Sequence, residues 1–153
     1  MPVAAWLAGA ALLAYVVLAV VPAPGPLDDP DQADQRTGFL IPREDARRLP
    51  PISGGLRFGA RPTLLLFDRR TPGRRPLQKI ISELPRGTTV TLVQAGTKRA
   101  GLARLAGLPR PRDGGYPIGY AIVDAKRLVR YVTLDPTYFE HGLEIETLVE
   151  AVE

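Results

Sequence analysis

The segment from residue 61 to residue 84 constrains the fold of this chain more than any other stretch. It begins with a continuous apolar run over 62–67 (PTLLLF), which is bounded by proline and charge. Such a run is typical of a strand that is buried on both faces and lies centrally in a sheet. After a basic loop, apolar residues recur at the spacing of one helical face, and Pro76 suits the first helical turn. These residues are Leu77, Ile80, Ile81 and Leu84.

The stretches on either side of this segment predict shorter elements. Residues 37–60 mix short apolar pieces with turn formers, so we expect short strands and loops there. The β-branched run 88–93 (TTVTLV) predicts a second strand. Residues 97–108 have the apolar spacing of a short helix, for which Thr97 is placed as the N-terminal cap.

The last part of the chain predicts a β-hairpin and a helix. Two apolar segments, 118–123 and 128–134, are separated by the polar turn 124–127 (DAKR). From residue 143 onward, the apolar residues share one helical face. They are Ile145, Leu148, Val149 and Val152. The predicted order is strand, helix, strand, helix, strand, strand, helix, and the fold class is therefore α/β.

The N-terminus predicts a membrane anchor over residues 1–22. Residues 3–21 are apolar and uncharged, and about 20 such residues cross a hydrocarbon core of about 30 Å as a helix. A cleaved signal peptide is the alternative, but no Lys or Arg precedes the run and three prolines follow it closely. Residues 23–36, rich in Pro and Asp, predict an extended linker that leads to a domain over 37–153.

The distribution of charge bears on orientation and partners. Four aspartates and no basic residue follow the apolar run before Arg36, which favours a cytoplasmic N-terminus and an extracytoplasmic domain at a bacterial cytoplasmic membrane. From residue 37 onward the chain has 19 Lys and Arg but 12 Asp and Glu, a net charge of about +7. Anionic lipid head groups or an acidic protein surface are the expected partners, and nucleic acid is not, given the predicted anchor.

The predicted order of elements resembles that of membrane-anchored thioredoxin-like proteins of bacterial envelopes. These include the disulfide reductases of cytochrome maturation and the accessory protein of methylamine dehydrogenase maturation. The resemblance covers residues 37–153 and is carried by 62–67 (PTLLLF) before a loop and helix, and by 116–124 (YPIGYAIVD). It implies that Pro117 is a cis-proline preceding a strand.

The resemblance breaks down at the redox site. Aligning Phe67 with the family's strand-end aromatic residue puts Pro72 and Arg75 where the family has its two cysteines, and this chain has no cysteine. Dithiol exchange needs a nucleophilic and a resolving sulfur. Disulfide reduction, isomerisation and thiol peroxidase chemistry are therefore excluded for this chain alone. We expect no enzyme activity and no cofactor.

A basic cluster in the same loop is the candidate binding site. Four arginines precede or begin a predicted helix, whose free N–H groups and dipole favour anions. They suit a carboxylate, a phosphate or an acidic partner surface, although a solvated loop is the ordinary reading of a charge run. With the neighbouring loop, the predicted partner-binding residues are Arg69, Arg70, Pro72, Arg74, Arg75, Tyr116 and Pro117.

Other polar residues predict no catalytic or metal site. His141 is the only histidine, and a lone histidine just before a helix is expected at the surface or at the helix start. The C-terminal glutamates are spaced as a solvent-facing side of the last helix and lack an accompanying nucleophile. These are Glu140, Glu144, Glu146, Glu150 and Glu153.

Three functional hypotheses follow. The leading one is a non-catalytic module that serves as a structural or docking accessory subunit of a larger integral membrane complex. The alternative is an accessory factor in envelope protein or cofactor maturation that works with a cysteine-bearing redox partner. An independent cysteine-free enzyme is the third, and a deep pocket that joins His141 to a carboxylate would support it.

Overall fold

The computed structural model describes residues 40–153. The predicted anchor and linker, residues 1–22 and 23–36, lie outside these residues. No helix within 40–153 combines the length and the apolar character needed to cross a bilayer. The described elements are β1 (Ile52–Ser53), β2 (Leu56–Arg57), β3 (Thr63–Asp68), α2 (Arg74–Glu83), β4 (Thr89–Gln94), α3 (Leu102–Ala106), β5 (Gly119–Val123), β6 (Val129–Leu134), the 3₁₀ helix η2 (Tyr138–Glu140) and α4 (Gly142–Glu150).

Four strands form one mixed sheet in the order β4-β3-β5-β6. β3 runs parallel to β4 and antiparallel to β5, and β5 runs antiparallel to β6. The prediction that β3 is central is confirmed, since it has a partner on each edge and Leu64 to Phe67 are fully buried. The register sets Leu66 opposite both Leu92 and Tyr120.

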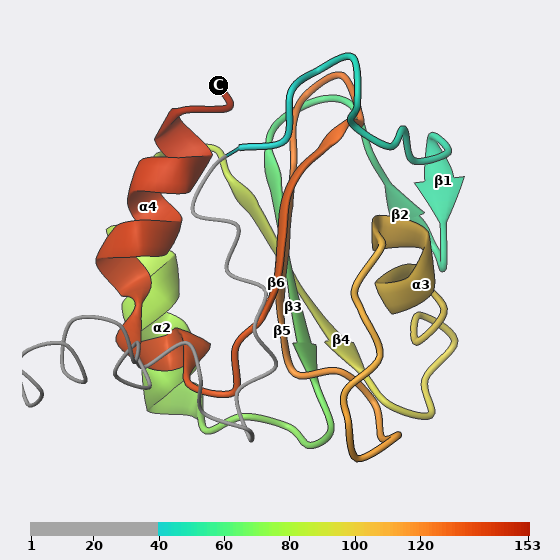
Figure 1. Cartoon of the computed structure of the whole chain (residues 1–153). Helices are drawn as coiled ribbons and strands as arrows, with labels where there is room; N and C mark the ends of the chain where they lie inside the picture. The colour runs from blue at the N-terminus through green and yellow to red at the C-terminus, as the bar shows by residue number, and fades with distance from the viewer. Residues whose placement is uncertain (1–39) are drawn as a thin grey trace, which may run out of the picture. The chain divides into compact units, whose positions relative to one another are not determined.

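Helices cover both faces of this sheet, as Figure 1 shows: α2 and α4 lie together on one face, and α3 lies with the β1–β2 hairpin on the other. The main core forms between the sheet and the α2–α4 pair. Alternate residues of β3, namely Leu64 and Leu66, pack there with Ile80 of α2 and with Ile145 and Val149 of α4. The apolar stripe predicted for the last helix is thus confirmed.

The segment before β1 covers the outer edge of β6. The backbone N–H of Ile41 donates to the carbonyl of Arg130 at 2.7 Å, and that of Val129 donates to the carbonyl of Arg47 at 2.8 Å. The N–H of Leu49 donates to the carbonyl of Arg127 at 2.8 Å. An edge strand presents unpaired backbone groups that invite pairing with other chains, so this segment protects β6.

The predicted hairpin between β5 and β6 is confirmed, and a buried carboxylate organises its turn. Asp124 is 2% exposed, and its Oδ1 accepts the backbone N–H groups of Lys126 at 2.8 Å and Leu128 at 2.9 Å. Arg127 takes a positive φ of 69°, which lets the chain turn back within four residues.

The short helix α3 begins later than the sequence predicts. It starts at Leu102 instead of Thr97, and Gly101 occupies its N-terminal cap position. The Thr97 hydroxyl donates to the carbonyl of Gln94 at 2.8 Å, so it stabilises the turn that follows β4. Threonine side chains commonly hydrogen-bond nearby backbone groups at turns, and such bonds compete with helix formation.

One residue of the predicted apolar face of α2 is also placed differently. Ile80 is 1% exposed, but Ile81 is 48% exposed. Leu77 and Leu84 are partly buried against the same core as Ile80. The buried stripe is therefore centred on Ile80, and the next residue, about 100° further round the helix, faces outward.

Candidate docking surface at the β3–α2 corner

The loop between β3 and α2, together with the first two residues of α2, forms what we term the β3–α2 corner (residues 69–75). Arg69 fixes this corner to the loop that precedes β5. Its Nε donates to the carbonyl of Tyr116 at 2.7 Å, and its Nη2 donates to Asp113 Oδ1 at 2.8 Å, with an ion pair to the same carboxylate. Asp113 Oδ1 also accepts the N–H of Gly115 at 2.8 Å. Arg69 thus acts as a clamp between two loops.

The clamp favours the charged form of its acidic partner. The hydrogen bond from Arg69 lowers the pKa of the Asp113 carboxyl below its ordinary value, and the N–H of Gly115 lowers it further. Both groups stabilise the carboxylate by donating to it. Arg69 is therefore committed to an intramolecular contact, which a sequence-based list of binding arginines does not reveal.

The prediction of a cis-proline at Pro117 is wrong. Within residues 40–153 every peptide bond is trans. The carbonyl of Tyr116 accepts from Arg69, and the carbonyl of Ile118 accepts the N–H of Asp135 at 3.0 Å. With a trans bond before Pro117, the chain reaches β5 with both of these carbonyls hydrogen-bonded. Because trans is the favoured isomer of an X–Pro bond, no additional contact is needed to stabilise it. The structure nevertheless places Tyr116 beside the corner, as the sequence predicts.

The rest of the corner is held to the ends of β3 and β4. Asp68, the last residue of β3, accepts the backbone N–H of Arg70 at 3.1 Å and the hydroxyl of Tyr138 at 3.2 Å. The side-chain amide of Gln94, at the end of β4, donates to Thr71 Oγ1 at 2.6 Å. Residues 70 and 71, in the first half of this loop, are therefore held to the ends of β3 and β4.

The N-terminus of α2 gathers positive charge without internal compensation. Gly73 is the cap residue and supplies no side-chain hydrogen bond, and the first turn has no acidic residue. Arg74 and Arg75 are the first two helical residues, are exposed, and have no carboxylate partner within residues 40–153. Cations at a helix N-terminus oppose its dipole by about 0.3–1 kcal/mol each. A bound anion would remove this penalty.

His141 lies at the start of α4, as predicted, and forms a pair that the sequence analysis missed. Its Nδ1 lies 2.7 Å from Oδ2 of Asp135, which is 2% exposed. Asp135 Oδ1 also bonds the backbone N–H and the hydroxyl of Thr137, each at 3.0 Å. The Asp-Pro-Thr sequence directly after β6 is the signal that indicates this turn. The arrangement fixes the entry into α4.

Glu144 departs from the predicted solvent-facing side of the last helix. Its Oε1 accepts the hydroxyl of Tyr120 at 2.9 Å and lies 3.5 Å from that of Tyr131. Both tyrosines are almost completely buried, and their rings stack with centroids 5.5 Å apart. Burial raises the pKa of Tyr120, with further contributions from Tyr131 and Glu144. Glu144 therefore satisfies buried hydroxyl groups of the core.

A hollow of about 350 Å³ lies away from these groups. It is lined by Gly54, Leu92, Gln94, Thr97, Lys98 and Arg99. Neither His141 nor a carboxylate lines it, so this hollow gives no support to the enzyme hypothesis. Lys98 and Arg99, which line the hollow, belong to a basic segment on the α3 side of the sheet.

A structural finding and three comparisons with known proteins bear on function. Within residues 40–153 no three His, Cys, Asp or Glu side chains are grouped so as to hold a metal ion. No family model matches the chain, and neither a curated protein nor a solved structure matches it. Function is therefore inferred from the sequence and from the geometry of residues 40–153.

Proposed function

We propose that this protein is a membrane-anchored docking subunit whose folded domain binds an acidic surface of a larger bacterial membrane protein complex through the β3–α2 corner. The observation that carries the proposal is the uncompensated positive charge of Arg74 and Arg75 at the uncapped start of α2. An acidic side chain of a partner would meet both guanidinium groups and the free N–H groups of the first turn.

The corner is suited to docking because its shape is set in advance. The Arg69 clamp holds one side of it, and the contacts of Asp68 and Gln94 hold the other. A preordered loop loses little conformational entropy on association, so more of the interaction energy appears as affinity. Within the corner, Arg69 positions the loop, and Arg70, Arg74 and Arg75 remain exposed for the partner.

The proposal includes a thioredoxin-like frame for the domain. The strand order β4-β3-β5-β6, with β5 antiparallel to its neighbours, supports this frame, as do α2 and α4 on one face and α3 on the other. In that frame the corner is the place of the cysteine pair, and Pro72 and Arg75 stand there. The trans bond before Pro117 is a departure from the frame.

The membrane location rests on the sequence. The uncharged run 3–21 is the proposed anchor, and the aspartates that follow it favour an extracytoplasmic domain. Such an anchor would keep the domain near the bilayer, where the corner meets the exposed parts of membrane complexes. We expect no nucleic-acid partner and no cofactor.

Co-purification tests this proposal. The full chain, tagged at its C-terminus and expressed at native level, is extracted in a mild detergent and its partners are quantified. The wild type is expected to retain a large membrane partner in near-stoichiometric amount, and Arg74→Glu/Arg75→Glu to lose it at least about tenfold, because both contacts become repulsive. The matched control Lys79→Glu/Arg86→Glu changes the net charge equally and should retain the partner.

Two results would refute the docking role. One is a wild-type chain that is recovered alone under these conditions, and the other is a corner variant that retains as much partner as the control. A partner recovered only in small, variable amounts, and bearing cysteines, would favour the maturation factor instead. That role predicts brief encounters with clients, whereas a subunit is present in the finished complex.

A further inference from the structure

A second basic surface lies on the side of the sheet that α2 and α4 do not cover. Residues 97–112, which include α3, contain five Lys and Arg residues and no Asp or Glu. Lys98, Arg104 and Arg110 are exposed. Together with the β1–β2 hairpin and Arg47, this segment forms what we term the α3 face.

Hydrogen bonds hold the parts of the α3 face together. Arg47 Nη1 donates to the carbonyls of Arg104 at 3.0 Å and Leu105 at 3.3 Å, near the end of α3. Arg99 Nε donates to the carbonyl of Gly54 at 3.1 Å, in the turn of the β1–β2 hairpin. The cations are therefore gathered on one structured surface, which includes the side of the hollow formed by Lys98 and Arg99.

Two large apolar side chains protrude from the same face. Ile52 in β1 is 59% exposed, and Leu105 in α3 is 38% exposed. Figure 1 shows β1 and α3 on the same side of the sheet. Exposed apolar side chains beside Lys and Arg also occur on the amphipathic helices that lie at the boundary between lipid head groups and acyl chains. Arginine binds phosphate well because its planar guanidinium donates two parallel hydrogen bonds.

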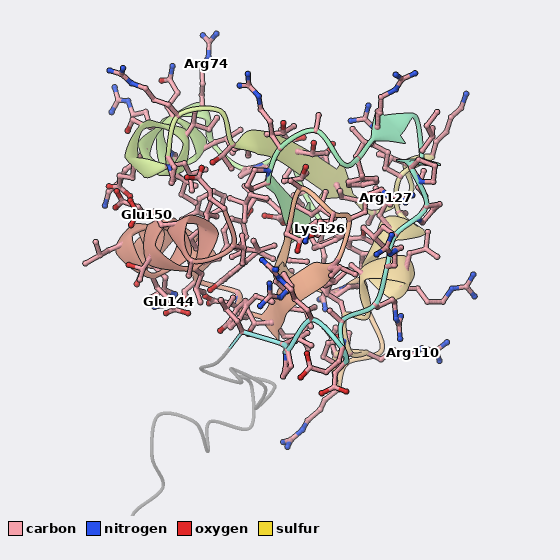
Figure 2. All side chains as sticks on the ribbon, turned by 90° about the horizontal axis from the view of Figure 1, so that it is seen from above. Arg74, Arg110, Lys126, Arg127, Glu144 and Glu150 are labelled. Atoms are coloured by element: carbon pink, nitrogen blue, oxygen red, sulfur yellow. The ribbon has the colours of Figure 1, made fainter. Side chains whose placement is uncertain are left out.

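On the opposite face of the sheet, α4 belongs to an acidic segment. Residues 136–153, which contain α4, include five glutamates and no Lys or Arg. Figure 2 shows Glu144 and Glu150 at α4, with Arg110 and Arg127 on the far side of the sheet. Within a Debye length of about 8–10 Å, a negatively charged bilayer attracts the α3 face and repels α4. The neighbouring helix α2 carries cations of its own, Arg74, Arg75 and Lys79. The acidic side of α4 therefore disfavours contact between that helix and the bilayer.

We propose that the α3 face lies on the anionic head-group surface of a bilayer, with its arginines at lipid phosphates and with Ile52 and Leu105 entering the interface. A lipid surface fits better than one acidic protein site because the cations are spread over α3 and its flanking loops, and a bilayer offers mobile anions across its whole area. The contact involves none of the corner arginines, so it does not depend on the partner proposed above.

Site-specific fluorescence tests this orientation, since the chain has no cysteine of its own. The full chain is reconstituted in nanodiscs of phosphatidylcholine, with or without about 30% phosphatidylglycerol. An environment-sensitive label is attached through Gly101→Cys, beside α3, or through Glu150→Cys, on α4. The label at 101 should rise in intensity at least about twofold in anionic discs and lose this rise at about 0.5 M NaCl. The label at 150 should stay unchanged.

Charge reversals identify the surface. Lys98→Glu/Arg104→Glu should abolish the response at position 101, and Arg74→Glu/Arg75→Glu should leave it intact, so failure of the corner proposal is distinguishable. Equal signals in neutral and anionic discs would overturn the inference. The inference would also be overturned if Lys98→Glu/Arg104→Glu responds to anionic discs like the parent chain. The same holds if this variant loses an acidic protein partner while its response to lipid is unchanged. If the chain does not assemble into nanodiscs, sedimentation with anionic and neutral vesicles decides the same question.

Discussion

The contact between Glu144 and the buried tyrosine pair gives a sharp test of the packing between α4 and the sheet. Tyr120 is fully buried, and its hydroxyl donates to Glu144 Oε1 at 2.9 Å. In Glu144→Ala this donor loses its acceptor, and an unsatisfied buried hydroxyl costs about 1–3 kcal/mol. Glu144 also lies in the first turn of α4, where a negative charge contributes about 0.3–1 kcal/mol. We expect Glu144→Ala to destabilise the domain by about 2–3 kcal/mol.

Three further variants separate these contributions. Glu144→Gln keeps an acceptor oxygen and loses the charge, so it should cost about 0.5–1 kcal/mol. Tyr120→Phe removes the donor and should cost about 1 kcal/mol. The double variant Glu144→Ala/Tyr120→Phe should cost at least about 1 kcal/mol less than the sum of its parts, because the Tyr120 hydroxyl is no longer there to be left unsatisfied. Glu150→Ala, exposed on the same helix, is the control, with an effect within about 0.5 kcal/mol.

The assay is urea unfolding of the full chain in one detergent, followed by far-UV circular dichroism. The single tryptophan, Trp6, lies in the predicted anchor, so its fluorescence does not report on the domain. The free energy of unfolding is compared at equal m-value. An effect of Glu144→Ala equal to that of Glu150→Ala, or a cycle that is additive within about 0.3 kcal/mol, would refute the role given to Glu144.

Two other predictions concern the same domain. A Cβ at Gly119 would overlap the carbonyl oxygen of Thr133, so Gly119→Ala should destabilise the domain by at least about 3 kcal/mol in the same urea assay. Gly101 has open space around it, so Gly101→Ala should change the free energy of unfolding by less than about 0.5 kcal/mol. Equal effects of the two substitutions would contradict this prediction. Burial raises the pKa of Tyr120 and Tyr138 in the folded state. The stability that each tyrosine contributes is therefore fully present below the unfolded tyrosine pKa of about 10 and is lost as the pH rises above it. The loss in the free energy of unfolding is up to about 1.4 kcal/mol per pH unit for each tyrosine. Absorbance at about 295 nm should show both ionising together with unfolding, and ionisation in a still folded chain would contradict the assignment.

The two proposed surfaces imply a division of roles within one domain. The α3 face would set the orientation of the domain on the bilayer, and the β3–α2 corner would select a protein partner. Both use arginine, but in different settings: the corner concentrates two cations at one helix start, and the α3 face spreads its cations over a wide surface. Partner binding should therefore depend on Arg74 and Arg75, and bilayer contact on Lys98 and Arg104.

The main elements of the fold could be predicted from local sequence patterns. The run 62–67 predicts the buried central strand, because apolar residues on both sides of a strand need cover on both faces. The turn 124–127 predicts the β5–β6 hairpin, and the stripe through Ile145 and Val149 predicts α4. These features were predictable since each depends on neighbours within a few residues along the chain.

The tertiary structure was needed to show which polar residues form contacts within the domain. Arg69 clamps Asp113 and Tyr116, which lie 44 and 47 residues away, and Glu144 satisfies Tyr120 from 24 residues away. The exposure of Ile81 also depends on distant packing. Sequence periodicity records which side of an element is apolar, but not which distant element meets it. At the corner, the sequence identified the arginines, and the fold separated Arg69, which is paired with Asp113, from Arg74 and Arg75, which have no carboxylate partner within residues 40–153.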